Sequence, residues 1–235
     1  MIDLYFWTTD NGYKVVQMLE ETGLDYAVKP VNLRNREQHD PVFLKISPGH
    51  KIPAIVDPDG PGGRIITLCE SGAILKYLAE KAGCDLYPEE PGLRAQVDQW
   101  FFYGTSTFTP HAQQFLLFYH RFEFDVPQAK AHYSAALRDM LSVLDRHLAE
   151  NEYFAGDYSI ADISCYPDVH IHAANIPCYS SDPGDPGDPG DGESHIGLDD
   201  YPNVRRWHDA IEARPAVQGA WANLTSIGMP PRGYR

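Results

Sequence analysis

The sequence predicts an α/β domain followed by an all-α domain, and three observations support this prediction. Residues 1–83 contain segments in the order strand, helix, strand, strand, strand, helix. After residue 91, every long segment with periodic apolar residues has helical spacing. Between the two parts, LYPEEPGL at residues 86–93 contains two prolines and is typical of a linker. We therefore expect domains at residues 1–84 and 91–235.

The chain begins with a predicted strand, helix and strand. The β-rich run IDLYF predicts a strand at residues 2–7, and from Asn11 apolar residues recur at helical spacing until Gly23. DYAVKPVNL, residues 25–33, predicts a second extended segment. A strand, helix and strand in this order form a parallel pair with a crossover connection.

The second half of the α/β domain contains a predicted hairpin. Residues 33–50 are polar and irregular, with one helical turn expected at 41–46. KIPAIVDPDGPGGRIITL then predicts strands at 53–57 and 64–67, which a DPDGPGG turn makes antiparallel. A helix at residues 70–82 follows and ends at Gly83.

The predicted all-α domain contains five helical segments and one insertion. SIAD, residues 159–162, predicts a capping box with Ser159 as N-cap. Residues 180–197 form a DPG-rich insertion whose repeat contains no apolar residue, so it cannot offset its ordering entropy by burial. Its aspartates do not follow the calcium-loop spacing. The expected helices span residues 91–119, 127–150, 160–174, 201–213 and 216–224.

The formal net charge is −14 and is unevenly distributed. Residues 1–83 hold 9 Lys and Arg against 11 Asp and Glu, so the rest of the chain holds 10 against 22. An acidic chain without a basic stripe argues against nucleic-acid binding, because phosphate neutralisation needs clustered Lys and Arg. No stretch approaches the roughly 18 apolar residues of a membrane span, and no signal-peptide pattern opens the chain. We expect a cytoplasmic protein with no membrane or nucleic-acid partner.

The cysteines and histidines do not predict a metal site. The four cysteines are widely separated and include no C-x-x-C, so neither a zinc site nor a dithiol redox centre is visible. DVHIH, residues 168–172, has two histidines two positions apart. On a helix these point about 200° apart and cannot share an ion. We expect no metal.

The motif KIPAIVD places Pro53 at the start of a predicted strand. A cis bond between Ile52 and Pro53 would turn the Ile52 backbone outwards. Its N–H and C=O could then pair with an extended peptide by strand addition. The alternative is a trans-proline that only begins the strand, and the motif alone does not separate the two.

The motif CESGAIL lies at the junction of the last predicted strand and its helix. The first N–H groups of that helix and the Ser71 hydroxyl form a seat for an anion, and Glu70 offers a carboxylate to a neighbouring cation. An α-amino acid head group has this pair of charges. Simple N-capping by Ser71 is the alternative.

The segment WTTDN, residues 7–11, carries short polar side chains where the first strand enters its helix. Thr9, Asn11 and nearby N–H groups lie where a helix dipole would stabilise a negative sulfur or oxygen. Each hydrogen bond that favours thiolate by about 1.4 kcal/mol lowers a thiol pKa by one unit. Thr9 and Asn11 could instead serve only as turn and cap residues.

Together these motifs resemble a cytosolic glutathione transferase. The motifs are T-x-N after the first strand, FLKISPGHKIPAIVD, ESGAILKYLAE and SIAD, and with MIDLYF and Gln38 they place the chain nearest the nu-class branch. That branch contains glutathione-dependent disulfide-bond oxidoreductases and the fungal prion-like members. The resemblance covers nearly the whole chain except the DPG insertion, and it implies a thioredoxin-like first domain, a helical second domain and a homodimer.

The resemblance also implies a role for individual residues. Ile52, held before Pro53, pairs with the cysteinyl backbone of glutathione, and Thr9 and Asn11 steady its sulfur as the catalytic pair. His132 stands where relatives place an arginine that contacts glutathione. The remaining implied contacts are Glu70 and Ser71 with the γ-glutamyl head, and Gln38, His50 and Lys51 with the glycyl end.

The second substrate is expected near the first helix of the all-α domain. Residues 100–124 contain ten aromatic residues, too many for one buried stripe of a single helix, so some should line a cleft. We expect Pro110 to kink this helix. The residues expected near the second substrate are Trp7, Phe108, His111 and Phe115.

The sequence thus predicts an enzyme that reduces disulfides by thiol exchange with bound glutathione or glutathione disulfide. One alternative is glutathione conjugation to electrophiles. The other is a non-catalytic binding module with the same fold.

Overall fold

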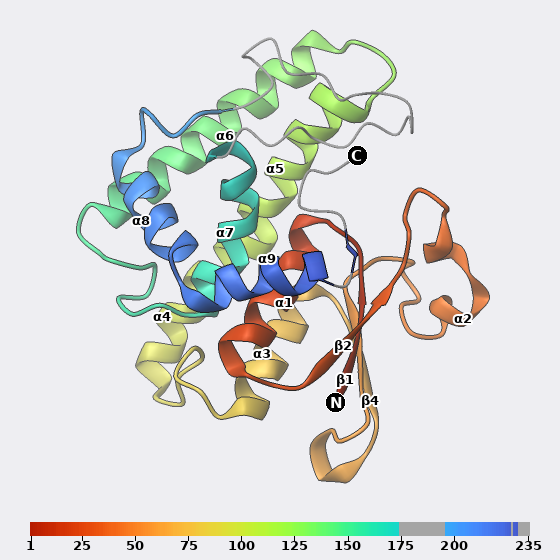
Figure 1. Cartoon of the computed structure of the whole chain (residues 1–235). Helices are drawn as coiled ribbons and strands as arrows, with labels where there is room; N and C mark the ends of the chain where they lie inside the picture. Colours follow the sequence, from red (N-terminus) through yellow and green to blue (C-terminus); the bar gives the residue numbers. More distant parts are fainter. Residues whose placement is uncertain (174–195, 227, 230–235) are drawn as a thin grey trace. The chain divides into compact units, whose positions relative to one another are not determined.

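The structure is a computed structural model that describes residues 1–173, 196–226, 228 and 229. Residues 180–195 of the predicted insertion therefore lie outside the described residues. The chain divides into two compact units, one formed by residues 1–87 with helix α9 (Pro215–Ser226), the other by the described residues of 88–214 (Figure 1). The sequence had assigned α9 to the all-α domain, whereas its packing groups it with the first unit.

The first unit is built on a four-stranded mixed sheet in the order β2-β1-β3-β4. Strand β1 (Ile2–Phe6) pairs parallel with β2 (Tyr26–Pro30), and β3 (Ala54–Asp57) pairs antiparallel with both β1 and β4 (Ile66–Cys69). The predicted parallel pair and hairpin are confirmed. Strand β4 begins two residues later than predicted, because a 3-10 turn at Pro61–Gly63 and a hydrogen bond from Gly60 N to Arg64 O extend the connection.

Helices cover both faces of this sheet. Alternate residues of β1 are buried towards α1 (Asp10–Thr22) and α3 (Ser71–Ala82), as the edge contact between the Phe6 and Tyr13 rings shows. On the other face, Tyr5 packs against Phe43 of the short helix α2 (Pro41–Leu44). Figure 1 shows α1 and α3 on one side of the sheet and α2 on the other. The first unit therefore has the layers of a thioredoxin-like domain.

Helix α9 packs on α1 through rings and polar groups. The rings of Tyr13 and Trp221 lie 4.3 Å apart between centroids. The Asn223 amide donates to Tyr26 Oη at 2.7 Å and to Glu20 Oε1 at 3.0 Å, and Tyr26 also donates to Glu20 at 2.6 Å. Burial and the neighbouring Glu20 carboxylate raise the pKa of Tyr26, and they outweigh the hydrogen bond from Asn223, which acts to lower it. Part of the helix-side surface of the first unit is thus covered by the last described helix.

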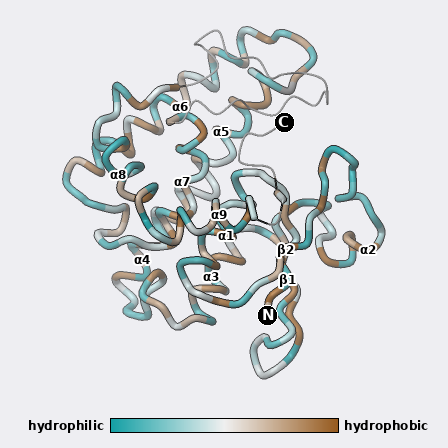
Figure 2. Tube along the Cα trace, viewed as in Figure 1, coloured by the Kyte–Doolittle hydropathy of each residue, from teal (hydrophilic) through white to brown (hydrophobic). Residues whose placement is uncertain are grey.

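The second unit is helical, as predicted. Helix α6 is amphipathic: teal and brown stretches alternate along it in Figure 2, and its residues Leu137, Leu141, Leu144 and Leu148 are buried. The predicted helix at 91–119 widens into π-helical turns at Tyr103–Phe108 and Leu117–Arg121. The α-helices are α4 (Pro91–Phe102), α5 (Thr109–Leu116), α6 (Pro127–Leu148), α7 (Ile160–Ala173) and α8 (Pro202–Glu212).

Two contacts explain how α7 is held. A Cβ at Gly104 would lie 2.1 Å from Ser164 Oγ, so only glycine permits this approach of the first π-helical turn to α7. The predicted capping box at Ser159 and Asp162 is present, with the Ser159 amide donating to Asp162 Oδ2 at 2.9 Å. Asp162 is fully buried and also accepts from Trp207 Nε1 at 2.8 Å and from the Phe154 amide at 3.1 Å. The capping residue therefore also ties α7 to α8.

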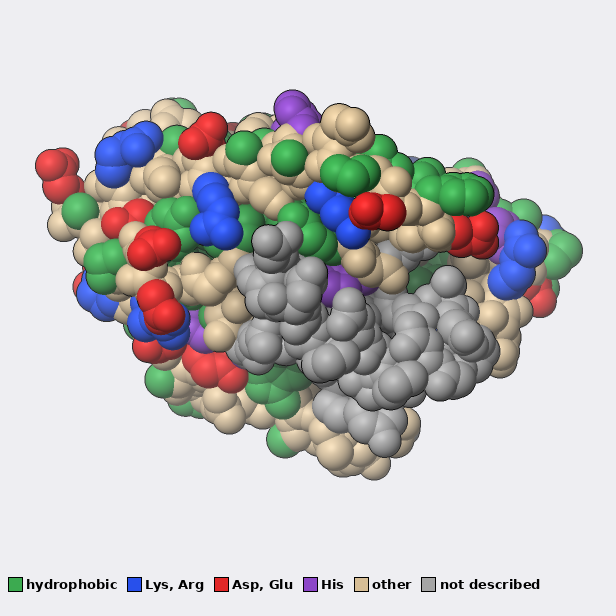
Figure 3. Space-filling model, turned by 90° about the horizontal axis from the view of Figure 1, so that it is seen from above, with side chains coloured by type: hydrophobic (Ala, Val, Ile, Leu, Met, Phe, Trp, Pro, Cys, Tyr) green, Lys and Arg blue, Asp and Glu red, His purple; other side chains and the backbone are tan. Residues whose placement is uncertain are grey.

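The surface has no single-sign patch on the face seen in Figure 3, where Lys and Arg side chains are interspersed with Asp and Glu over the described atoms. Within the described ranges, no helix combines the length and the apolar character that crossing a bilayer requires.

Candidate functional site

The first turn of α1 is held against the end of β1. Thr9 is the N-cap, with extended backbone angles, and its Oγ1 accepts a hydrogen bond from Gly12 N at 3.3 Å. A Cβ on Gly12 would lie 2.6 Å from the Trp7 carbonyl oxygen, so a glycine is needed there. Asn11 is half-buried between these residues. The predicted pair Thr9 and Asn11 therefore occupies a fixed turn at a helix N-terminus.

The N-terminus of α3 meets that of α1. Ser71 Oγ donates to Asn11 Oδ1 at 3.3 Å, although the two residues are 60 positions apart in the sequence. Glu70 precedes the helix with φ 72°, and its exposed side chain makes no capping hydrogen bond. Both helix ends carry partial positive charge from unsatisfied N–H groups. The first unit thus brings Asn11, Glu70 and Ser71 together where anionic groups are favoured.

The backbone at Ile52 is open for pairing. The Ile52–Pro53 peptide bond is cis, which settles the alternative left by the sequence. The β3 ladder begins at Ala54, and within the described part of the chain neither the N–H nor the C=O of Ile52 has a hydrogen-bond partner. Ile52 itself is partly buried against Val31 and Phe43. Its main chain keeps the donor and acceptor that an extended peptide could use.

The segment before β3 contains several of the predicted polar site residues. Gln38 Oε1 is buried and has no hydrogen-bond partner among the described residues, and His50 has φ 46°. The rings of His39 and His50 lie 4.9 Å apart between centroids. Lys51 is exposed, and its backbone N–H and C=O both bond Ser47 Oγ. His39 was not predicted, because its neighbour His50 is distant in sequence and no motif links them.

The predicted residues of the second unit divide into exposed and buried ones. His132 is exposed on α6, with its ring against Tyr133. His111 is half-buried, and its Nδ1 lies 2.7 Å from the Thr107 carbonyl oxygen. Phe108 and Phe115 are fully buried in the helical core, so they offer no surface to a substrate. This corrects the expectation that both side chains lie near the second substrate. Some of the aromatic residues of 100–124 fill the core of the second unit instead. In the first unit, Trp7 is half-exposed.

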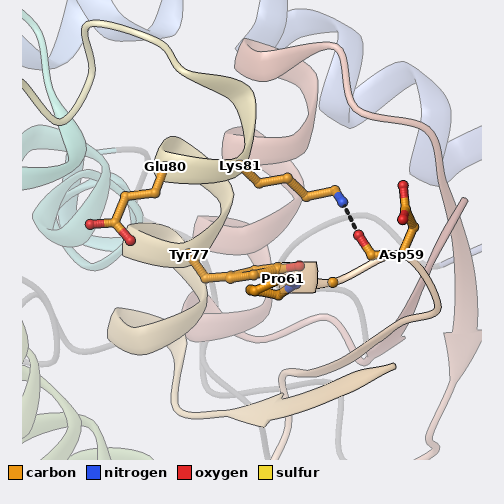
Figure 4. Close-up of a pocket in the computed structure, with 6 residues that line it drawn as sticks. Asp59, Pro61, Tyr77, Glu80 and Lys81 are labelled. Atoms are coloured by element: carbon orange, nitrogen blue, oxygen red, sulfur yellow. Dashed lines mark hydrogen bonds between the residues drawn. The ribbon is translucent and has the colours of Figure 1, made fainter. Parts of the chain in front are cut away.

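A cavity of about 280 Å³ lies beside α3, away from the predicted site residues. Its lining residues are Asp59, Gly60, Pro61, Tyr77, Glu80 and Lys81 (Figure 4). Lys81 Nζ reaches the Asp59 carbonyl oxygen at 2.5 Å and Asp57 Oδ2 at 3.0 Å. Since its lysine is already paired and none of the predicted residues lines it, we do not assign this cavity to the site.

Asp57 beside this cavity predicts an acid-sensitive contribution to stability. Burial acts to raise the pKa of Asp57, but hydrogen bonds from Tyr77 and Lys81 outweigh it and lower the pKa. A carboxyl whose folded pKa lies below its unfolded value of about 3.9 stabilises the fold above that pH and loses the contribution as the pH falls further. In urea titrations below about pH 4, the free energy of unfolding should therefore fall more steeply for the native chain than for Asp57→Asn. Parallel pH profiles would contradict this.

Comparison with known proteins gives consistent matches over almost the whole chain. Residues 12–81 match the glutathione S-transferase N-terminal domain and residues 108–215 match the glutathione S-transferase C-terminal domain. The first match begins after Thr9 and Asn11, so the placement of those residues rests on the geometry above. The disulfide-bond oxidoreductase YfcG of Escherichia coli is 39% identical over 219 residues, which cover 92% of this chain and 93% of that protein.

Solved structures similar to this chain also belong to glutathione transferases. A glutathione transferase from Pseudomonas putida with one glutathione disulfide bound per subunit is 36% identical, with a TM-score of 0.80 over 93% of this chain and 90% of that chain. A family member from Pseudomonas fluorescens with two glutathiones bound is 35% identical, with a TM-score of 0.81 over 93% and 91%. The Ure2 protein of Candida maltosa is 30% identical, covering 88% of this chain and 68% of that protein. The chain therefore belongs to the glutathione S-transferase family, in the branch that includes the Escherichia coli disulfide-bond oxidoreductases and the fungal Ure2 proteins.

Proposed function

We propose that the protein is a glutathione-dependent disulfide-bond oxidoreductase. The observation that supports this best is the junction of two helix N-termini at Asn11 and Ser71, beside a chain segment without cysteine. Relatives point the same way, since one is named a disulfide-bond oxidoreductase and another holds glutathione disulfide. The family also contains glutathione S-transferase 3 of Zea mays, 32% identical, so conjugation of electrophiles is the rival activity.

In this proposal glutathione lies extended along the open backbone of Ile52, and its cysteinyl N–H and C=O pair with that residue. The exposed Glu70 carboxylate receives the α-ammonium group, and Ser71 with the α3 N-terminus receives the α-carboxylate. At the glycyl end, the unpartnered Gln38 Oε1 can accept the glycyl N–H, while His50 and Lys51 face the carboxylate. His132 of the second unit is proposed as a further contact.

Thr9 and Asn11 stabilise the sulfur as thiolate. When glutathione binds, the Ser71 hydroxyl turns its single proton from Asn11 Oδ1 to the α-carboxylate, and the Asn11 amide NH₂ can donate to a sulfur anion. The N-terminus of α1 adds favourable potential. These groups lower the pKa of the bound thiol and increase the fraction that can attack. Trp7 and His111 remain the proposed contacts of the second substrate.

The reaction needs two glutathione molecules per disulfide. The first thiolate attacks one sulfur of the substrate, forms a mixed disulfide and expels the other sulfur as a thiolate, which takes up a proton. A second glutathione thiolate attacks the glutathione sulfur of the mixed disulfide, and the second substrate sulfur leaves as a thiolate, which also takes up a proton. The substrate disulfide gains two electrons, and the two glutathiones become glutathione disulfide.

A paired assay tests the proposal. Purified protein with glutathione should reduce hydroxyethyl disulfide faster than it conjugates 1-chloro-2,4-dinitrobenzene. Cys69→Ser should keep the reductase activity, because Cys69 is a half-buried free thiol on the α2 face and the attacking sulfur belongs to glutathione. Activity on the chloronitrobenzene alone would establish the rival function. Binding of glutathione disulfide without any turnover would indicate a non-catalytic binding module.

We also propose that the protein acts as a cytoplasmic homodimer, as the family resemblance implies. Light scattering in solution should give twice the chain mass of 26.4 kDa. A single-chain mass at micromolar concentration would contradict the dimer.

A further inference from the structure

Three side chains of the second unit form a cluster of metal-binding type, separate from the residues proposed for glutathione. His170 comes from α7, and His208 and Glu212 come from α8, four residues apart on one face of that helix. One nitrogen or oxygen from each lies within 4.8 Å of the others. His170 Nδ1 is 2.9 Å from His208 Nε2 and 3.2 Å from Glu212 Oε2.

These separations suit the coordination sphere of a small ion. With metal–nitrogen and metal–oxygen bonds of about 2.0–2.2 Å, neighbouring ligands of a tetrahedral ion lie about 3.3–3.5 Å apart. The observed distances are a few tenths of an ångström shorter, so a slight separation of α7 and α8 side chains would admit the ion. Two histidines and one carboxylate form an established ligand set for zinc.

The surroundings of the cluster orient its ligands. His208 Nδ1 lies 2.8 Å from Asp209 Oδ1, and a proton on Nδ1 leaves the Nε2 lone pair directed at the cluster. Tyr166 donates a short hydrogen bond to Glu212 Oε2, and its ring stacks on that of His208 at 5.5 Å between centroids. Metal-bound histidines commonly have such a carboxylate on their second nitrogen. This arrangement holds the imidazole in the form that binds a metal.

The cluster is also accessible. The side chain of Glu212 is 33% exposed and that of His170 is 12% exposed, while His208 is 9% exposed. An ion can therefore enter from solvent on the Glu212 side and leave most of the histidine rings shielded. His172 is not part of the cluster, because its ring packs against Phe115.

We propose that His170, His208 and Glu212 bind one divalent first-row transition-metal ion, with zinc as the test ion, and that the ion fastens α7 to α8. His170 contacts His208 and His172 contacts Phe115, which agrees with the expectation that these two histidines cannot share an ion. The proposed site replaces the expectation that the protein binds no metal. The second histidine comes from another helix, 38 positions along the chain.

Zinc binding to the full-length protein tests this. The protein is stripped with a chelator and titrated with Zn²⁺ against a chromogenic competitor, without glutathione, whose thiol would itself bind zinc. The native chain should bind one equivalent and show a higher thermal midpoint with zinc. Glu212→Gln and His208→Ala should lose this equivalent. Asp209→Ala, at an exposed position, should weaken it about 10- to 100-fold.

His132→Ala is the matched control, because it removes an exposed histidine outside the cluster and should leave zinc affinity unchanged. Co²⁺ provides a second readout, since its visible absorption intensifies in a four-coordinate site and should do so in the native chain but not in Glu212→Gln. Equal zinc affinity in the native chain, Glu212→Gln and Asp209→Ala would overturn the proposal. So would absence of a zinc equivalent in the native chain, and the cluster would then be a hydrogen-bonded network alone.

Discussion

Replacing Asp162 by alanine is expected to lower the free energy of unfolding by about 3 to 5 kcal/mol. The substitution leaves buried donors without their acceptor, namely the amides of Phe154 and Ser159 and the Trp207 indole. Each orphaned buried donor costs about 1–3 kcal/mol. It also separates the start of α7 from α8, because Trp207 lies on α8. Urea unfolding followed by tryptophan fluorescence measures the loss.

Asp139→Ala is the control for this prediction, since Asp139 is exposed on α6 and the change should stay within about 0.5 kcal/mol. Asp162→Asn should fall between the two, because the amide keeps one acceptor oxygen but turns its NH₂ towards donors. A loss below about 1 kcal/mol in Asp162→Ala would mean that the three hydrogen bonds from the amides and the indole to Asp162 are easily replaced.

Substitutions at the junction of α1 and α3 are expected to separate binding from chemistry. Ser71→Ala should raise the KM for glutathione about 10- to 100-fold, because a hydrogen bond to a charged group contributes about 1.5–3 kcal/mol. Its kcat at saturating glutathione should change little. Asn11→Ala should instead lower kcat and raise the pKa of the bound thiol by about one unit, which the ultraviolet absorbance of the thiolate reports as a function of pH.

Thermal unfolding of both variants provides the control. Because Ser71 and Asn11 are only half-buried, each substitution should lower the free energy of unfolding by about 1 kcal/mol at most. Cys84→Ser, at the other end of α3, should alter neither kinetic constant. Equal falls in kcat for Ser71→Ala and Asn11→Ala, with KM unchanged, would contradict the assigned roles.

Local signals in the sequence were sufficient for most of the fold. Gly23 and Gly83 mark helix ends because both adopt left-handed backbone angles, φ 65° and 60°, which glycine tolerates best. The apolar alternation of IDLYF identifies β1 because its alternate residues Ile2, Leu4 and Phe6 are buried on the face covered by α1 and α3. The motif residues Thr9, Ile52 and Ser71 lie at element ends, where sequence patterns are most specific.

Contacts between distant segments could not be predicted in the same way. The bond between Asn11 and Ser71 and the pairing of His170 with His208 depend on how helices pack, and spacing along the chain contains no such information. Phe108 and Phe115 were misplaced because an aromatic-rich segment looks the same whether it lines a cleft or fills a core. The family resemblance implies glutathione as the ligand. The missing hydrogen-bond partner of Gln38 Oε1 among the described residues is visible only in the structure.

The packing of α9 on α1 has a consequence for biosynthesis. The ribosome releases residues 1–87 first, but Tyr13 and the Glu20–Tyr26 pair gain Trp221 and Asn223 only after residues 88–214 have also emerged. This surface of the nascent α/β portion therefore stays uncovered until α9 has been synthesised. Premature termination before residue 215 would give a product in which this surface of α1 stays exposed, and quality-control proteases would degrade that product.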